Sequence, residues 1–477
     1  MRRTRVLPAA AALLLAASGC TVGPDYQRPA VEVPAAYKEQ PPAADGWRTA
    51  VPQDAAARGS WWSVFGDPQL DALIRQVDVS NENLKAFEAA FRAAQAGVAA
   101  SRAGLFPTLS LGGSFQRAQS GGISGQPEPP PVNSFDFSLA SASWQPDLWG
   151  RIRRTIEASR ATAGASAGDL ASARLAAEAE LAADYLQLRI ADALKRLLDE
   201  TVVAFRESLR IATNQYNAGI VSKADVVSAE TQVRSTEAQA INVGVQRAQF
   251  EHAIALLIGK APADLSIPAV DSVPGVPVAP AGLPSALLER RPDIAAAERR
   301  VAAANAEIGV AIAAYFPDIT LTASYGTTAA NLANLAQFSN PVWAVGLQLA
   351  QTVFDAGLRG AQVEQARATF DQSAALYRQT VLTAFQQVED QLAALRILEQ
   401  QAAVEADTVR LALEAQRLTL NQYKAGTVPY TSVITAQTQA LANQQIALSV
   451  LQSRLLAAVA LIQALGGGWD TGEMPGA

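Results

Sequence analysis

The sequence predicts a mostly α-helical chain that also carries the strands of a membrane β-barrel. Three observations support this fold class. The chain contains one unit twice, each copy has two short runs of alternating polar and apolar residues, and each copy has a proline-free helical stretch of more than sixty residues. Short strands beside helices of such length do not fit a compact soluble domain. We therefore expect four β-strands and long coiled-coil helices.

The first twenty residues form an export signal. Three arginines among the first five residues precede an apolar stretch over 6–17, and small residues lead up to Cys20, the only cysteine. This pattern predicts a signal peptide over 1–19. Cys20 follows Ser-Gly, as in a bacterial lipoprotein cleavage box, so we expect a lipidated, extended segment over 20–60. The alternative is an incidental cysteine in a cleaved signal.

The tandem duplication is visible as matching segments at a nearly constant spacing. "NQYNAGIVSKADVVSAETQ" begins at residue 214 and "NQYKAGTVPYTSVITAQTQ" begins at residue 421, and ten of their nineteen positions are identical. "GLFPTLSLGGSF" and "AYFPDITLTASY" match in the same way. The predicted organisation is a first repeat, a proline-rich linker, a second repeat and a tail, over 61–259, 260–284, 285–465 and 466–477.

Each repeat contains a predicted β-hairpin with a long loop, over 108–146 and over 319–355. Apolar residues occupy every second position over 135–139 and over 343–349, which is the period of a β-strand with two different faces. One such hairpin is typical of a half-buried cap on a soluble bundle. Two hairpins with strands of this length match a transmembrane barrel.

Four strands cannot close a barrel by themselves. About eight strands is the smallest number that encloses packed side chains, and open strand edges are not tolerated in lipid. The chain must therefore assemble with further copies, and complete sets of four strands leave a dimer, a trimer or a tetramer open.

A helix of unusual length follows the hairpin in each repeat, over 150–217 and over 358–424. At about 1.5 Å per residue, each would reach roughly 100 Å. Shorter helices over 223–258 and 428–465 return along them, and a helix from about Pro68 to Phe106-Pro107 precedes the first hairpin. The second long helix carries a coiled-coil seam with spacings of three and four, formed by Tyr377, Val381, Phe385, Val388, Leu392 and Leu395.

The two copies of the Tyr-x-Ala-Gly motif are predicted to be the tips of helical hairpins. Gly219 and Gly426 are the residues best able to take the left-handed conformation that ends a helix. Asp225 lies near the start of the first returning helix, where a carboxylate suits the helix dipole. We weigh this capping role of Asp225 equally against a role in gating. The tips are expected at the end of the long helices that is remote from the strands.

Composition excludes several classes of function. The net charge is −6 and no basic cluster follows the signal, which argues against a nucleic-acid partner. No nucleotide-binding or hydrolase motif occurs in a supporting context, and His252 has no histidine or cysteine cluster around it for a metal. After the signal, no uninterrupted apolar run has the length of a membrane-spanning helix. The expected protein is not an enzyme and has no cofactor.

Several motifs together make the chain resemble the TolC-like outer-membrane efflux factors, in the OprM/NodT-like lipoprotein branch that works with resistance-nodulation-division pumps. They are "TVGPDY" after Cys20, "WWSVFGDPQLDALI" at 61–74, "DLWGRIRR" at 147–154, "ALLIGKAP" at 255–262, "LLERRPDI" at 287–294 and the two tips. The resemblance covers nearly the whole mature chain. It implies a homotrimer whose twelve strands form one outer-membrane barrel, continued by an α-helical tunnel in the periplasm.

The resemblance also implies roles for single residues. The periplasmic gate corresponds to Asp225 and Tyr423, with Tyr216 at the other tip. Where some members carry an arginine and acidic residues, this chain has Val428, Ser432 and Thr435, so we expect a more apolar constriction. The helix-barrel junctions correspond to a further set, made up of Pro107, Pro146, Pro317 and Gly357.

The expected function is that of a passive exit duct for small molecules such as antibiotics, anchored by lipid in the outer membrane. A periplasmic adaptor protein would open it and an inner-membrane pump would supply the cargo. Two alternatives stay open: the exit duct of a protein (type I) secretion or metal-ion export system, and a non-conducting envelope scaffold. For the dense charge cluster over 289–293, local ion pairing is favoured over partner binding.

Overall fold

The computed structural model describes residues 21–34, 36–39, 60–119, 130–277, 291–335 and 341–467. The signal peptide and Cys20 lie outside the described residues. The chain divides into two compact units, and each unit draws on both repeats. The first comprises residues 1–30, 90–166 and 297–377, and the second comprises 31–89, 167–296 and 378–477.

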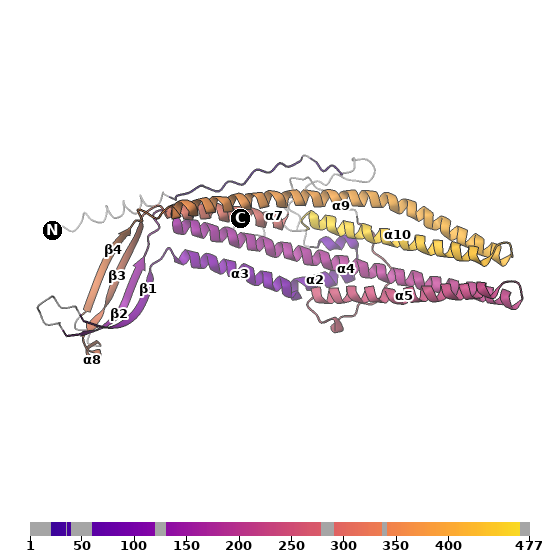
Figure 1. Cartoon of the computed structure of the whole chain (residues 1–477), viewed down its shortest axis with the longest axis horizontal. Coiled ribbons are helices and arrows are strands. Elements are labelled where there is room, and N and C mark those ends of the chain that lie inside the picture. Colours follow the sequence, from indigo (N-terminus) through magenta and orange to yellow (C-terminus); the bar gives the residue numbers. More distant parts are fainter. Residues whose placement is uncertain are drawn as a thin grey trace. The chain divides into compact units, whose positions relative to one another are not determined.

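The first unit contains a four-stranded antiparallel sheet in the order β1-β2-β3-β4 (Figure 1). Strands β1 (Thr108–Ala118) and β2 (Val132–Trp144) form the hairpin of the first repeat. Strands β3 (Asp318–Ala329) and β4 (Pro341–Ala350) form the hairpin of the second. The central pairing of β2 with β3 joins the repeats, so β1 and β4 are the edges.

The sheet exposes apolar side chains that a soluble protein would bury. Both edge strands are exposed along nearly their full length in the single chain. The exposed apolar side chains on these strands are Leu109, Leu111, Phe115, Val342, Trp343, Val345, Leu347 and Leu349. A large exposed apolar surface of this kind marks contact with a membrane or another protein. A four-residue helix, α8 (Leu332–Leu335), follows β3 and was not expected from the sequence.

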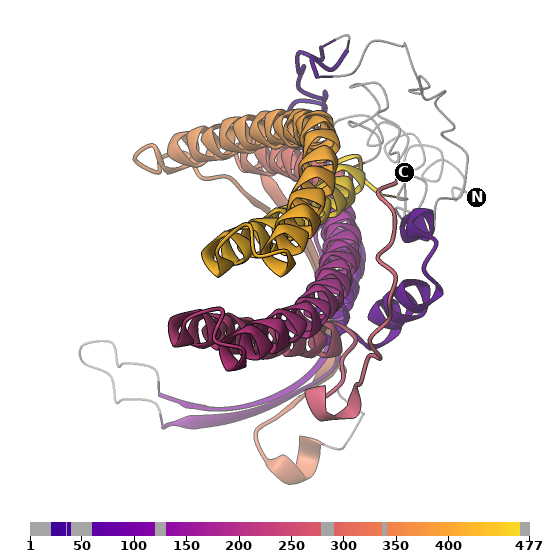
Figure 2. The same ribbon diagram turned by 90° about the vertical axis from the view of Figure 1, so that its right-hand side faces the viewer.

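Helices α4 (Arg151–Asn217) and α9 (Leu358–Lys424) run for 67 residues each without interruption. Helix α5 (Lys223–Leu257) returns along α4, and α10 (Tyr430–Ala464) returns along α9. All six residues of the expected seam on α9 are buried. Figures 1 and 2 show the α4–α5 and α9–α10 hairpins side by side in the second unit.

The helix expected from Pro68 to Phe106 is two helices, α2 (Pro68–Ser80) and α3 (Glu82–Ala103). The break is at Asn81, which is 5% exposed. Its side-chain oxygen accepts hydrogen bonds from the backbone N–H groups of Asn83 and Leu84, and its amide donates to the carbonyl of Leu257 at 2.8 Å. An asparagine side chain that binds the backbone in this way caps a new helix rather than continuing the old one.

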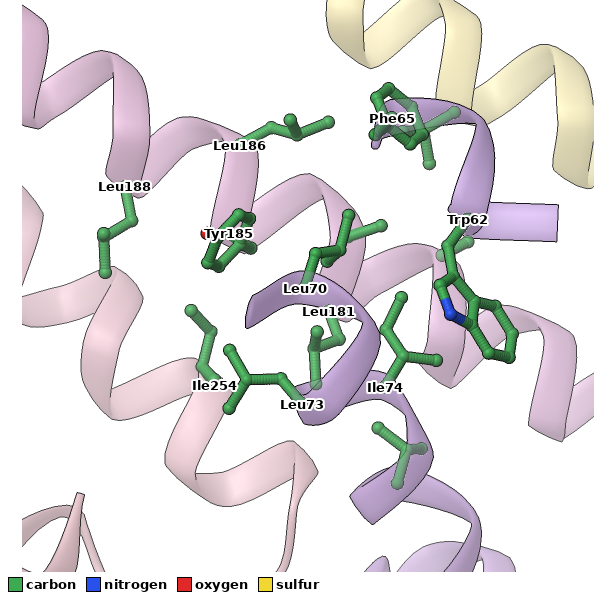
Figure 3. Close-up of a cluster of buried hydrophobic side chains, with 14 of the residues drawn as sticks. Trp62, Phe65, Leu70, Leu73, Ile74, Leu181, Tyr185, Leu186, Leu188 and Ile254 are labelled. Carbon is green, nitrogen blue, oxygen red and sulfur yellow. The ribbon is translucent and has the colours of Figure 1, made fainter. Parts of the chain in front are cut away.

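The main core of the second unit packs around α4 (Figure 3). Leu181 and Tyr185 of α4 meet Leu70 and Ile74 of α2 and Ile254 of α5, all essentially fully buried. The short helix η1 (Trp61–Phe65) covers one side, and a second short helix, η2 (Pro262–Asp264), opens the linker. Helix α7 (Pro292–Ala313) follows the linker, and its residues from 297 onward belong to the first unit.

One helix departs from the expectation that no helix could cross a membrane. By length and composition α10 is apolar enough to do so, because it is rich in alanine and leucine and poor in charge. Its residues Leu455 and Val459 lie in the main core and Leu441 lies in a second apolar cluster with α4 and α5. The most apolar stretch of α10 is 33% buried within the chain, and one helix that is long and apolar enough is weak evidence for a membrane span.

Candidate functional site

The two hairpin tips share one backbone design. Gly219 and Gly426 have positive φ angles of 74° and 73°. At the first tip the N–H of Gly219 donates to the carbonyl of Tyr216, and that of Ile220 donates to the carbonyl of Gln215. The same two bonds recur around Gly426 in the second repeat. This pair of bonds is the Schellman motif, in which the left-handed residue satisfies the last helical carbonyls.

Asp225 caps the first returning helix. One of its carboxylate oxygens accepts hydrogen bonds from the backbone N–H of Ser222 at 3.1 Å and from the Ser222 hydroxyl at 2.9 Å. The hydroxyl in turn accepts from the N–H of Asp225, which completes a capping box. The second repeat has Pro429 and Ser432 in these places and no such box. Asp225 therefore has a structural role whether or not it also acts in gating.

The site itself is an apolar cluster that we call the tip cluster. Its buried members come from all four helices of the tips and are Ala212, Ala229, Tyr423, Tyr430 and Val433. The rings of Tyr423 and Tyr430 lie 5.2 Å apart, centroid to centroid, and both side chains are almost fully buried. The corresponding tyrosine of the first repeat, Tyr216, is 42% exposed. The two repeats thus place equivalent tyrosines in different surroundings.

Burial and a nearby carboxylate keep both tip phenols neutral. Burial raises the pKa of Tyr430 to about 12, with smaller contributions from Tyr423 and Asp225. Burial also raises the pKa of Tyr423, and the charge of Asp225 adds to that effect. The Tyr423 hydroxyl is buried and has no hydrogen-bond partner. The neutral Tyr423 hydroxyl can donate a hydrogen bond, and a small movement of the tip would let it donate to the nearby Asp225 carboxylate.

The other expected gate residues lie around this cluster in different ways. Val428 is half-buried and packs against the tip cluster. Ser432 is half-buried on the first turn of α10. Thr435 is exposed, and its hydroxyl donates to the carbonyl of Thr431 on the same helix. The structure therefore brings Asp225, Tyr423 and Val428 to one place and leaves Thr435 on the surface.

A buried polar contact between the two repeats was not anticipated from the sequence. The amide of Gln437 on α10 donates to the hydroxyl of Ser208 on α4 at 2.8 Å, and both residues are at most 2% exposed. The Ser208 hydroxyl donates onward to the carbonyl of Ala204, whereas the side-chain oxygen of Gln437 has no partner. The sequence contains a signal for this contact. Gln437 follows Tyr430 and Val433 at helical spacings of three and four, so it lies on the buried face of α10, where a polar side chain needs a partner.

The expected junction residues all lie between a helix and a strand. Pro107 precedes β1 and Pro317 precedes β3, each after a helix has ended. Pro146 follows β2, and Gly357 stands directly before α9 with a φ of 90°. Of the charge cluster over 289–293, only Arg291 to Asp293 are described, and the Arg291 guanidinium forms two hydrogen bonds with the Asp293 carboxylate.

Comparison with known proteins places this architecture in a family. The profile described as outer membrane efflux protein matches residues 73–260 and 283–467. The toluene efflux pump outer membrane protein TtgC of Pseudomonas putida is 32% identical over 459 residues, which cover 95% of this chain and 94% of TtgC. The outer membrane protein OprJ of Pseudomonas aeruginosa is 31% identical over 483 residues, which cover 99% of this chain and 98% of OprJ.

Solved structures agree with these relatives. The outer-membrane channel OprN superposes with a TM-score of 0.87 at 28% identity, over 94% of this chain and 100% of that one. The open state of the MtrE outer membrane channel of Neisseria gonorrhoeae gives a TM-score of 0.81 at 28% identity, over 94% and 98% of the two chains. The duplicated strand-and-helix architecture and these matches lead to one conclusion: the chain belongs to the outer membrane efflux protein family.

Proposed function

We propose that this chain is the outer-membrane exit duct of a tripartite efflux pump and conducts small molecules as a homotrimer. The observation that carries the proposal is the four-stranded sheet with two long edge strands. Within the described residues, β1 pairs only with β2 and β4 pairs only with β3. In lipid, the free N–H and C=O groups of both edges must be paired, and the edge of another copy supplies that pairing.

Ring closure follows from the strand directions. Neighbouring strands are antiparallel throughout the sheet, so β1 and β4 run in opposite directions. Strand β4 of one copy can therefore pair with β1 of the next copy in the same antiparallel manner. Such a head-to-tail contact generates a closed ring when the rotation fits. Three copies give twelve strands, the number that the resemblance to the TolC-like factors implies.

Exposed apolar side chains on the long helices support the same assembly. On α5 they are Val227, Ile241, Val245 and Leu256, and on α9 they include Ile397, Val404, Leu411 and Leu418. These residues recur along helices whose opposite faces are already packed within the chain. We infer that α9 of one copy covers α5 of its neighbour, so that the helices continue the ring as a tunnel.

The tips then form the mouth of the tunnel. The tip cluster holds the two hairpins of each copy together, and Val428 narrows the opening without a charge. A periplasmic adaptor protein would open the mouth by separating the tips, and an inner-membrane resistance-nodulation-division pump would supply energy and cargo. The chain is anchored by lipid on Cys20 in the outer membrane.

Planar-bilayer recording of the purified oligomer tests the duct directly. The expected result is small, intermittent conductance for the unaltered protein and larger conductance for the Tyr423→Phe, Asp225→Ala double variant. Native mass spectrometry of the same sample should give three copies. If neither protein conducts and the detergent-extracted chain is monomeric, the duct is refuted. If both conduct equally, the duct stands and the two residues have no part in gating.

A further inference from the structure

Residues 21–26, with the sequence "TVGPDY", lie in a specific site in the first unit, and we call them the docking segment. Arg154, which is only 3% exposed, donates from its guanidinium to the carbonyls of Val22 and Gly23 and to the Asp25 carboxylate at 2.9 Å. The remaining guanidinium nitrogen donates to Glu157 at 2.8 Å. A buried guanidinium whose nitrogens are all used in this way is a built binding site for a peptide backbone.

Helix α7 supplies the other side of this site. The side-chain amide of Asn305, 4% exposed, donates to the carbonyl of Pro24 at 3.0 Å. Glu298 accepts a hydrogen bond from the Tyr26 hydroxyl at 2.6 Å, and burial, with a smaller contribution from this carboxylate, raises the pKa of that phenol. Arg154, Asn305 and Glu298 thus hold the segment through backbone and side chain together.

Two glycine contacts show how closely the segment fits. Gly23 has a φ of 96°, and a Cβ there would lie 2.5 Å from the Cα of Gly309 on α7. A Cβ on Gly150 would lie 2.9 Å from the Cα of Thr21. Both distances are shorter than real Cβ contacts, so each of these two glycines lets the docking segment approach the backbone.

The segment ends at the boundary between sheet and helices. The N–H of Val22 donates to the carbonyl of Trp149, whose indole donates to the carbonyl of Pro317 at 2.8 Å and stacks on Phe316 at 4.9 Å. Pro317 directly precedes β3. Aromatic residues at the ends of barrel strands are typical of a membrane interface. Thr21 is therefore held at the level where the proposed barrel meets the membrane surface.

We propose that Arg154, Asn305 and Glu298 form a receptor for the docking segment, and that this receptor positions the lipid anchor at the base of the barrel. The inference rests on the proposed lipidation of Cys20. Adjacent Cα atoms are about 3.8 Å apart, so an acyl group on Cys20 has a tether of one residue beyond the docked Thr21. The protein therefore fixes the position of the lipid anchor. This role also explains why the motifs "TVGPDY" and "DLWGRIRR" occur in the same chain, since Arg154 of the second motif binds the first.

The test uses the full mature chain, exported from a signal peptide that is cleaved without lipidation. Because Cys20 is the only cysteine, a thiol-specific spin label attaches at this position alone. The unaltered chain should give an immobilised electron paramagnetic resonance spectrum. Arg154→Ala should lose the immobilised component. Arg151→Ala is the matched control, since this exposed arginine in the same helical turn donates to Gln145 and not to the segment, and it should keep that component.

Two gentler variants guard against misfolding of Arg154→Ala. Asp25, whose side chain is 94% exposed, and the Tyr26 hydroxyl each contribute one bond to docking. Asp25→Ala and Tyr26→Phe should each give a partly mobile label in a normally assembled oligomer. A label that is mobile in the unaltered chain, or equally immobile in all variants, would overturn the receptor.

Mass spectrometry of the naturally exported chain separates this proposal from the lipid anchor. If Cys20 carries no acyl group, the anchoring role fails, whereas an immobilised label would still establish the receptor. If Cys20 is acylated and the label is mobile, lipidation stands and the receptor is refuted.

Discussion

Replacing Ser208 with alanine should loosen the contact between α4 and α10 more than replacing Gln437 with leucine. Among the residues that the structure describes, Ser208 is the acceptor of the Gln437 amide, whose side-chain oxygen has no partner there, and Ser208→Ala removes this acceptor. A buried amide without any bond then remains. Gln437→Leu leaves the Ser208 hydroxyl still donating to the carbonyl of Ala204 and removes the amide altogether.

The magnitude follows from the cost of burying an unpaired polar group. Leaving a buried donor unsatisfied costs about 1–3 kcal/mol, whereas replacing both partners by apolar groups can be nearly neutral. We expect Ser208→Ala to cost about 1–3 kcal/mol of local stability. The Ser208→Ala, Gln437→Leu double variant should cost less than Ser208→Ala alone. The coupling between the two sites should be about 1 kcal/mol or more.

Hydrogen exchange of the tip helices, measured by mass spectrometry, reads this local stability. A loss of about 1–3 kcal/mol accelerates exchange by about 5- to 150-fold where local opening controls it. Thr438→Ala is the control, because its exposed hydroxyl bonds only to Ile434 of its own helix. Additive effects of the two single changes would show that the pair contributes packing alone and would refute the reasoning.

Three further changes test other features. Asp225→Ala and Ser222→Ala both break the capping box and should lower the local stability of α5, measured by hydrogen exchange, by about 0.5–2 kcal/mol. Higher conductance with Asp225→Ala but not with Ser222→Ala would show that Asp225 also acts in gating. Burial raises the pKa of Glu178 from 4.5 to about 7. The contribution of the neutral Glu178 side chain to the free energy of unfolding should therefore be complete below pH 4.5 and fall by at most about 3 kcal/mol as the pH rises through 7. Glu178→Gln should abolish that slope in thermal unfolding, and an unchanged slope would contradict it. Gly309→Ala places a Cβ 2.9 Å from the Arg154 side chain and should make a spin label on Cys20 more mobile, with an unchanged spectrum as the contrary result.

Local patterns in the sequence predicted the elements well. The long helices were expected over 150–217 and 358–424, and they span 151–217 and 358–424 in the structure. Such agreement has a physical reason, since no proline interrupts these helices and each is followed by a glycine in the left-handed conformation, Gly219 or Gly426. The break at Asn81 was missed, because a polar residue on an amphipathic helix is equally typical of a cap and of a solvent-facing position.

Predictions about single site residues were less complete. The sequence placed Tyr423 and Asp225 at the tips, but it left open whether Asp225 capped a helix or acted in gating. The capping box depends on the orientation of the Ser222 side chain, which spacing along the chain does not specify. The Ser208–Gln437 contact joins residues 229 positions apart, so it exists only once both hairpins have packed.

The sequence by itself determined the duplication, the alternation of the strands and the ends of the two long helices, because these depend on residues close together in the chain. Only the tertiary structure decided which of two equivalent tyrosines is buried and where the docking segment binds. Tyr216 and Tyr423 have the same local motif, yet Tyr216 is 42% exposed, whereas Tyr423 is buried in the tip cluster, which includes Ala212 and Ala229 of the other hairpin. Burial and docking are properties of surfaces formed by distant segments, and no local pattern records them.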